Sequence, residues 1–195
     1  MTSLIAIGGH TGTGKTTLAY GLLRTVGALN NAVIVEDDQV RRELLGVGLD
    51  RTLCDEDYMP SISAKVVEII ERRTTETLSR NIPVINASGF FTESSRQAVQ
   101  KLAESLHKKF IGLWLVAPVD VMKARIAKRL DERRTGQRLT LEQGHASDAD
   151  QTVLAKFGNL GLPQSPAWNI IDASVSAQDL LAAAINILKG RKTTP

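Results

Sequence analysis

Short apolar runs alternate along this chain with longer segments in which apolar residues recur every three to four positions. The short runs have the length and composition of buried strands, and they lie at residues 3–8, 32–35, 83–87, 109–117 and 168–171. The longer segments have the period of a helix with one buried face, and they lie at residues 16–26, 61–80, 92–106 and 118–130. Ser176, with Asp179 three residues later, is expected to cap a last helix.

Strands that alternate with helices predict a parallel sheet whose two faces are both covered by helices. We therefore expect an α/β protein with a five-stranded parallel sheet in a three-layer α/β/α sandwich. No repeat and no low-complexity linker divides the sequence, so residues 1–195 are expected to form a single domain. Ligands of such sheets bind at the carboxyl ends of the strands, which directs attention to the residues that follow each strand.

The composition indicates the class of protein and its cellular location. The chain has 195 residues, of which 43% are hydrophobic and 23% charged, as is typical of a soluble globular protein. No apolar run approaches the roughly 18 residues needed to cross a bilayer, and the first run is too short for a signal peptide. A single cysteine, Cys54, excludes an intramolecular disulfide. We expect a cytoplasmic protein without a membrane partner, while its oligomeric state stays open.

A phosphate-binding loop follows the first predicted strand. Residues 9–16 match the pattern G-x-x-x-x-G-K-[ST] in full, between a strand and a helix as this motif requires. The loop's backbone N–H groups and the helix N-terminus attract phosphate oxygens, Lys15 can reach the β- and γ-phosphates, and the Thr16 hydroxyl can ligate Mg²⁺. The predicted ATP-binding residues are Gly9, Thr11, Gly12, Thr13, Gly14, Lys15, Thr16 and Thr17.

Three acidic residues, Glu36, Asp37 and Asp38, follow the second predicted strand, about 20 residues beyond Lys15. A motor-type ATPase usually carries its acidic strand much further along, and a GTPase would need an N-K-x-D motif, which this sequence lacks. In a kinase, a carboxylate at this position can accept or orient the proton of the attacking hydroxyl group. The alternative is that these acids only favour the start of the following helix.

The phosphate loop followed by Asp38-Gln39-Val40-Arg41 resembles the D-x-x-R arrangement of P-loop small-molecule and polynucleotide kinases. Within these, the chain is similar to predicted bacterial AAA-family ATP-binding kinases related to polynucleotide kinase, gluconate kinase, chloramphenicol phosphotransferase and the zeta toxins. The resemblance implies that Asp38 is the general base or orients the attacking hydroxyl group, and that Arg41 contacts an anionic acceptor. Asp37 is the alternative base and is otherwise expected to bind substrate. Arg42 is expected to face solvent.

The third predicted strand ends in Asn86, Ala87 and Ser88. Related kinases often carry aspartate where Asn86 stands, and an amide is a weaker partner than a carboxylate for hydrated Mg²⁺. Asn86 and Ser88 are candidates for hydrogen bonds to substrate, with strand-end capping as the alternative. Arg96, in the helix that follows, is expected to serve either substrate binding or structure.

A basic and polar segment follows the fourth strand and its helix. Arg125 and Arg129 are four residues apart and therefore share one face of that helix. The resemblance places a helical lid at residues 125–150, in which Arg125 and Arg129 would neutralise the transferring phosphoryl group. Arg133 and Arg134 are alternates for this role, and surface salt bridges are the competing interpretation.

Together these features favour an ATP- and Mg²⁺-dependent phosphotransferase that acts on a hydroxyl group of a small molecule. The acceptor is expected to bind within residues 40–70, which include charged residues and Tyr58. The alternatives are a polynucleotide 5′-hydroxyl kinase and a regulatory ATPase that has no small-molecule acceptor. A nucleic-acid substrate is disfavoured because only 4% of residues are aromatic and they are not interleaved with basic ones.

Overall fold

A computed structural model describes residues 2–135, 139–143, 146–147 and 161–190 of the chain. Its centre is a five-stranded sheet with the strand order β2-β3-β1-β4-β5, in which every neighbouring pair is parallel. The strands are β1 (Ser3–Gly9), β2 (Val33–Glu36), β3 (Val84–Ala87), β4 (Lys109–Val116) and β5 (Trp168–Asp172). The predicted five-stranded parallel sheet is therefore confirmed.

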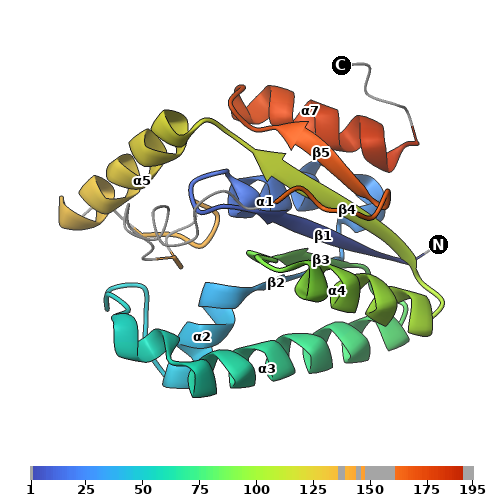
Figure 1. Cartoon of the computed structure of the whole chain (residues 1–195), viewed down its shortest axis with the longest axis horizontal. Helices are drawn as coiled ribbons and strands as arrows, with labels where there is room; N and C mark the ends of the chain where they lie inside the picture. Colours follow the sequence, from blue (N-terminus) through green and yellow to red (C-terminus); the bar gives the residue numbers. More distant parts are fainter. Residues whose placement is uncertain (1, 136–138, 144–145, 148–160, 191–195) are drawn as a thin grey trace.

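Helices cover both faces of the sheet and make the three predicted layers (Figure 1). One face carries α1 (Lys15–Thr25) and α7 (Ala177–Leu188), and the other carries α3 (Pro60–Ser79) and α4 (Glu93–Ser105). Strand β1 serves both layers, because Ile5 and Ile7 join one core cluster while Leu4 and Ala6 join the other. A strand buried on both faces reads as a continuous apolar run, which is the pattern that the sequence shows here.

Two further helices border the carboxyl ends of the strands. Helix α2 (Asp37–Leu45) begins at the residue after β2, and short 3₁₀ turns occur at Gly27–Leu29 and Asp55–Tyr58. Helix α5 (Val119–Arg134) passes the expected end at residue 130. Its last turn lacks apolar period, but it is rich in good helix formers and contains an Arg134–Asp131 ion pair of 2.8 Å. Residues 136–138, 144–145 and 148–150 of the predicted lid lie outside the described residues.

The expected cap of the last helix is present. The hydroxyl oxygen of Ser176 accepts a hydrogen bond of 3.2 Å from the backbone N–H of Asp179, and the same hydroxyl donates to the Asp179 carboxylate over 2.7 Å. These bonds fix where α7 starts. Among the helices that the structure describes, none is long and apolar enough to cross a membrane.

Candidate functional site

The phosphate loop joins β1 to α1 and packs tightly against neighbouring backbone. Gly9 and Gly12 have φ angles of 136° and 79°, in the range that favours glycine. A Cβ atom on Gly9 would lie 2.5 Å from the carbonyl oxygen of Leu115, and one on Gly12 would lie 2.8 Å from that of Met122. Glycine is therefore required at both positions, because the loop turns sharply where it meets β4 and α5.

Lys15 folds back over this loop. Its Nζ atom donates hydrogen bonds of 2.9 Å to the carbonyl oxygens of both Gly9 and His10, and the Thr13 hydroxyl donates to the same His10 oxygen over 2.7 Å. Burial lowers the pKa of Lys15 to about 8, although the carboxylates of Glu36, Asp37 and Asp38 act in the opposite direction. The loop thus holds a partly desolvated ammonium group in a fixed place, as phosphate binding requires.

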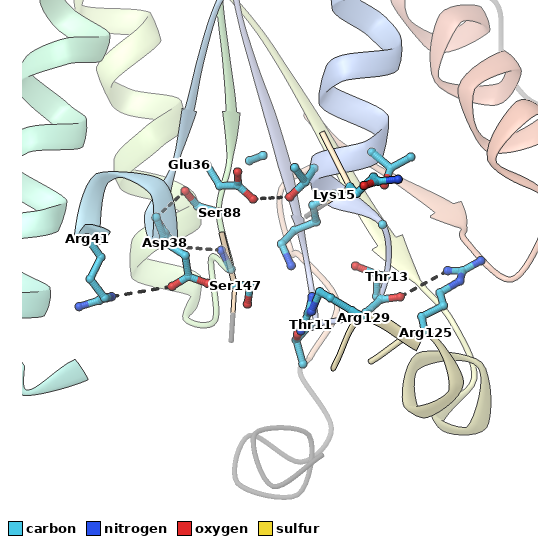
Figure 2. A pocket seen from close by; sticks show the side chains of 18 of the residues that line it. Thr11, Thr13, Lys15, Glu36, Asp38, Arg41, Ser88, Arg125, Arg129 and Ser147 are labelled. Atoms are coloured by element: carbon cyan, nitrogen blue, oxygen red, sulfur yellow. Dashed lines mark hydrogen bonds and ion pairs between the residues drawn. The ribbon is translucent and has the colours of Figure 1, made fainter. Parts of the chain in front are cut away.

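A cleft of about 990 Å³ opens between the phosphate loop, the α2–α3 region and α5. Figure 2 shows side chains from all three regions pointing into it. The predicted site residues that line it are Thr11, Gly12, Thr13, Gly14, Lys15, Thr16, Thr17, Asp37, Asp38, Arg41, Ser88, Arg125 and Arg129. Gly9 and Asn86 do not line it. The carbonyl oxygen of Gly9 accepts a hydrogen bond from Lys15, and Asn86 is only 3% exposed.

Glu36 points at the phosphate loop. The Thr16 hydroxyl donates a hydrogen bond to Oε1 of Glu36, and Glu36, although it is the N-cap residue of α2, makes no side-chain capping bond. Its side chain is buried, and burial raises its pKa to about 7. Helix capping therefore does not explain the direction of the Glu36 side chain. Sequence analysis identified Glu36 only as one of three successive acidic residues.

Asp37 is bound to the segment that follows β3. Its Oδ1 atom accepts a hydrogen bond of 2.7 Å from the Ser88 hydroxyl, and its Oδ2 atom accepts one of 3.2 Å from the backbone N–H of Gly89. The same Ser88 hydroxyl lies 2.5 Å from Oδ1 of Asn86. Burial raises the pKa of Asp37. Because both of its oxygens are engaged, Asp37 is poorly placed to take up a proton from a substrate.

Asp38 has different surroundings. Its Oδ1 atom accepts a hydrogen bond of 3.1 Å from the Tyr58 hydroxyl and lies 3.8 Å from Nε of Arg41. The guanidinium carbon of Arg41 is 4.4 Å from the centre of the Tyr58 ring, and Arg41 also donates to the Asp57 carbonyl oxygen over 2.9 Å. The Asp38 side chain is 18% exposed and borders the cleft. Of the two aspartates, Asp38 is the one whose carboxylate is open to a ligand.

The expectation that Arg42 faces solvent is wrong. Arg42 is only 3% exposed, and its guanidinium donates to the carbonyl oxygens of Ala146 over 2.8 Å, Arg51 over 2.7 Å, and Gly48. The physical reason is that the segment just after α2, which contains Gly48 and Arg51, and Ala146, which is far along the chain, cover this side of α2. A helix-surface argument from neighbouring residues cannot anticipate such a cover.

Arg96 does not line the cleft and makes structural contacts instead. It is buried, donates to Glu93 and to the carbonyl oxygen of Phe90 over 2.9 Å each, and lies 5.0 Å from the centre of the Trp114 ring. Of the two functions considered for Arg96, these contacts match the structural one.

The four arginines of α5 divide into two groups. Arg125 and Arg129 line the cleft, together with Lys128 and Glu132, which the sequence did not single out. Arg125 is close to the loop, with Nη1 at 3.4 Å from the carbonyl oxygen of Gly12. The alternates do not line the cleft: Arg133 donates to the Leu49 carbonyl oxygen over 2.6 Å, and Arg134 pairs with Asp131 at the surface.

Sequence comparison connects residues 4–154 with a family model described as an AAA domain. An uncharacterized protein of Mycobacterium tuberculosis is 31% identical over 134 residues, which make up 65% of this chain and 25% of that protein. A counterpart in Mycobacterium bovis has the same values. The chain therefore spans about a quarter of the length of the curated relatives that it matches.

Solved structures with the same fold include several kinases. APS kinase of Mycobacterium tuberculosis, in complex with AMPPNP and APS, superposes with a TM-score of 0.64 at 16% identity, covering 96% of this chain and 98% of that one. A gluconokinase from Sinorhizobium meliloti gives 0.56 at 18% identity, with coverages of 96% and 92%. The tunicamycin resistance protein of Deinococcus radiodurans gives 0.53 at 16% identity, with coverages of 100% and 99%. At these identities the likeness shows a shared three-layer P-loop fold.

Proposed function

The chain belongs to the AAA-domain family, and from that premise we propose that it is an ATP-dependent phosphotransferase acting on a hydroxyl group of a small molecule. The placement of Asp38 carries this proposal. Its carboxylate, on a side chain that is 18% exposed, borders the same cleft as the phosphate loop, beside Arg41 and Tyr58. A carboxylate held opposite a phosphate loop is what transfer to a hydroxyl group requires.

In the proposed reaction, the acceptor hydroxyl gives its proton to Asp38 while its oxygen forms a bond to the γ-phosphorus of ATP. The bond between the γ-phosphorus and the β,γ-bridging oxygen breaks, and its electron pair leaves with ADP. Lys15 would hold the β- and γ-phosphates, and Arg125 and Arg129 would stabilise the charge on the transferring group. Nearby α5 side chains would also exclude water from the cleft.

The residues at the loop fit a Mg²⁺ ion. The Thr16 hydroxyl and the Glu36 carboxylate, which are joined by a hydrogen bond, supply oxygen atoms, the type of ligand atom that Mg²⁺ prefers. When bound with ATP, the ion would neutralise part of the phosphate charge.

The acceptor would bind between α2 and α3. This end of the cleft combines charged and hydroxyl groups with apolar side chains, contributed by Arg41, Asp55, Ser63, Leu53, Val66 and Val67. Such a lining suits a compact molecule that presents both polar and apolar surface.

The proposal is tested by an ADP-release screen against sugars, nucleosides, antibiotics and 5′-hydroxyl oligonucleotides. We expect a small molecule to raise ADP release and Asp38→Asn to abolish that rise, while Asp120→Asn, at an exposed position of α5, keeps it. Stimulation by oligonucleotides alone would favour a polynucleotide kinase. Tight nucleotide binding without any stimulating acceptor would favour a regulatory ATPase, and full turnover by Asp38→Asn would remove Asp38 as the base.

A further inference from the structure

Three large hydrophobic side chains line the cleft and remain exposed there. Tyr58 is 38% exposed, Val67 54% and Phe91 36%, and they come from the turn before α3, from α3 itself and from the segment after β3. Exposed apolar surface in a concave site is typical of contact with the apolar part of a ligand. Because the Tyr58 hydroxyl donates to Asp38, this apolar surface adjoins the place where the acceptor hydroxyl would react.

We propose that the acceptor is an uncharged hydroxyl compound that carries an aromatic ring, and that Phe91 selects for this ring by packing against it. This inference deepens the proposed function and rests on it. It gives the acceptor a charge and a shape, in place of the anionic acceptor that the resemblance implies for Arg41.

The backbone after β3 is strained in a way that presents Phe91 to the cleft. Phe90 has a φ angle of 45°, in the left-handed region that a bulky residue rarely adopts. The Phe90 ring packs in the core, with its centre 5.4 Å from that of a Trp168 ring, while Phe91 lines the cleft. Two successive phenylalanines therefore serve different surroundings. Strain of this kind persists where the surrounding structure enforces it, and it is concentrated at functional sites.

The Phe91 ring also has a specific place to lie. A Cβ atom on Gly89 would be 2.5 Å from this ring, so glycine at that position leaves the room that the ring occupies. The ring centre of His10, in the phosphate loop, lies 6.4 Å from that of Phe91, within the range of aromatic pairs. Phe91 is thus held beside the loop that would bind the nucleotide, where an acceptor packed on the ring would lie next to the transferring group.

The charges at this end of the cleft disfavour an anionic acceptor. Arg41 is only 6% exposed and donates to the Asp57 carbonyl oxygen over 2.9 Å. Its Nε atom faces Asp38 at 3.8 Å (Figure 2), and the Tyr58 ring lies over its guanidinium group. The carboxylates of Asp38 and Asp55 line the same end, and Asp55 is exposed. A negatively charged acceptor would meet two carboxylates and a buried arginine that is already engaged, whereas an uncharged acceptor avoids this repulsion.

The first test sorts acceptors by charge and by ring. ADP release from Mg-ATP is measured with three sets of hydroxyl compounds at equal concentration: sugar acids and sugar phosphates, uncharged sugars and polyols, and uncharged ring compounds such as nucleosides, phenyl glycosides and benzyl alcohols. We expect the best compound of the third set to stimulate ADP release about 10-fold more than any compound of the other two.

The outcomes separate this inference from the proposed function. Stronger stimulation by the anionic set, or by the uncharged compounds without a ring, would overturn this inference and leave the proposed phosphotransferase intact. No stimulation by any set would overturn both, and the Kd of a non-hydrolysable ATP analogue would then show whether nucleotide binding is retained.

The second test compares two valines of nearly equal exposure, using the best ring-bearing acceptor. Val67 lines the cleft, whereas Val119, which is 56% exposed at the start of α5, does not. Val67→Ala should raise KM for the acceptor several-fold, because it removes apolar contact, and Val119→Ala should leave it unchanged. Equal KM values in the two variants would show that this wall of the cleft does not contact the acceptor.

Phe91 is tested by removing and by keeping its ring. Phe91→Ala should raise KM for the acceptor by about 10-fold or more, with KM for ATP unchanged, while Phe91→Tyr keeps the ring and should stay close to wild type. A wild-type KM for the acceptor in Phe91→Ala, or an equal rise in KM for ATP and for the acceptor, would overturn the role of Phe91.

Discussion

The Tyr58 hydroxyl donates a hydrogen bond of 3.1 Å to the Asp38 carboxylate, and so connects the turn before α3 with the first turn of α2. The Tyr58 ring also lies against the guanidinium group of Arg41, 4.4 Å from its central carbon. Asp38 is thereby held from two sides, by a hydroxyl donor and by a cation 3.8 Å away. Both contacts orient the carboxylate that we propose as the base.

Tyr58→Phe keeps the ring and its contact with Arg41 but removes the donor to Asp38. We expect kcat for acceptor-dependent ADP release to fall by about 10-fold, because a base that loses its orientation reaches the reactive geometry less often, and KM for ATP to stay the same. Tyr20→Phe makes the same change on α1, outside the cleft lining, and serves as the control. Equal kcat values in the two variants would show that the hydrogen bond does not position the base.

The phosphate loop and the sheet could be predicted because their signals are local. An apolar run ending in Gly9, followed by Lys15 and Thr16, specifies a strand, a turn and a helix start from adjacent residues. The directions of Glu36, Asp37 and Asp38 could not be predicted in this way. They are successive residues at one strand–helix junction, and the partners that separate them are far away in the sequence: Thr16, Ser88 and Tyr58.

A second prediction concerns the backbone of the phosphate loop. In Gly9→Ala, the new Cβ would meet the Leu115 carbonyl oxygen at 2.5 Å, at a φ of 136°. We expect the free energy of unfolding to fall by about 2 kcal/mol or more, from backbone strain and overpacking. Gly27→Ala is the matched control, since a Cβ there has no atom within 4 Å among the described residues, and it should stay within about 1 kcal/mol of wild type. Similar denaturant midpoints for both variants would contradict the prediction that Gly9→Ala strains the loop backbone.

A third prediction follows from the buried guanidinium of Arg42. Arg42→Lys keeps the charge, but an ammonium group cannot reproduce the planar arrangement of donors that serves the carbonyl oxygens of Ala146, Arg51 and Gly48. We expect a loss of about 2 kcal/mol in the free energy of unfolding. Arg73→Lys changes an ion pair at the surface, whose side chains are about two-fifths exposed, and should cost less than about 1 kcal/mol. Urea titrations of both proteins give the comparison.

A fourth prediction concerns the dependence of stability on pH. The backbone N–H of Cys54 donates to Asp57 over 2.9 Å, and this bond, with contributions from the Cys54 thiol and Arg51, lowers the pKa of Asp57 below 3.8. The folded state therefore favours the charged form, so this stabilisation is present above pH 3.8 and is lost as the pH falls through the lower, folded-state pKa. The stability difference between wild type and Asp57→Asn should be constant from pH 7 to about 5 and shrink below pH 3.8. A difference that persists unchanged at lower pH would exclude this linkage.

The last prediction separates the basic residues of α5 by their position. Arg129 lines the cleft, and its charge is close enough to Lys15 to contribute to lowering the lysine pKa. A guanidinium group there can neutralise charge that grows on the phosphoryl oxygens during transfer, so Arg129→Ala should reduce kcat by about 10³-fold while the Kd of the ATP analogue changes far less. Arg134→Ala removes an arginine of the same helix whose side chain is 82% exposed and paired with Asp131, and it should keep kcat. If single-turnover measurements show the same loss in both variants, the effect comes from the net charge of α5 and not from a contact with the phosphoryl group.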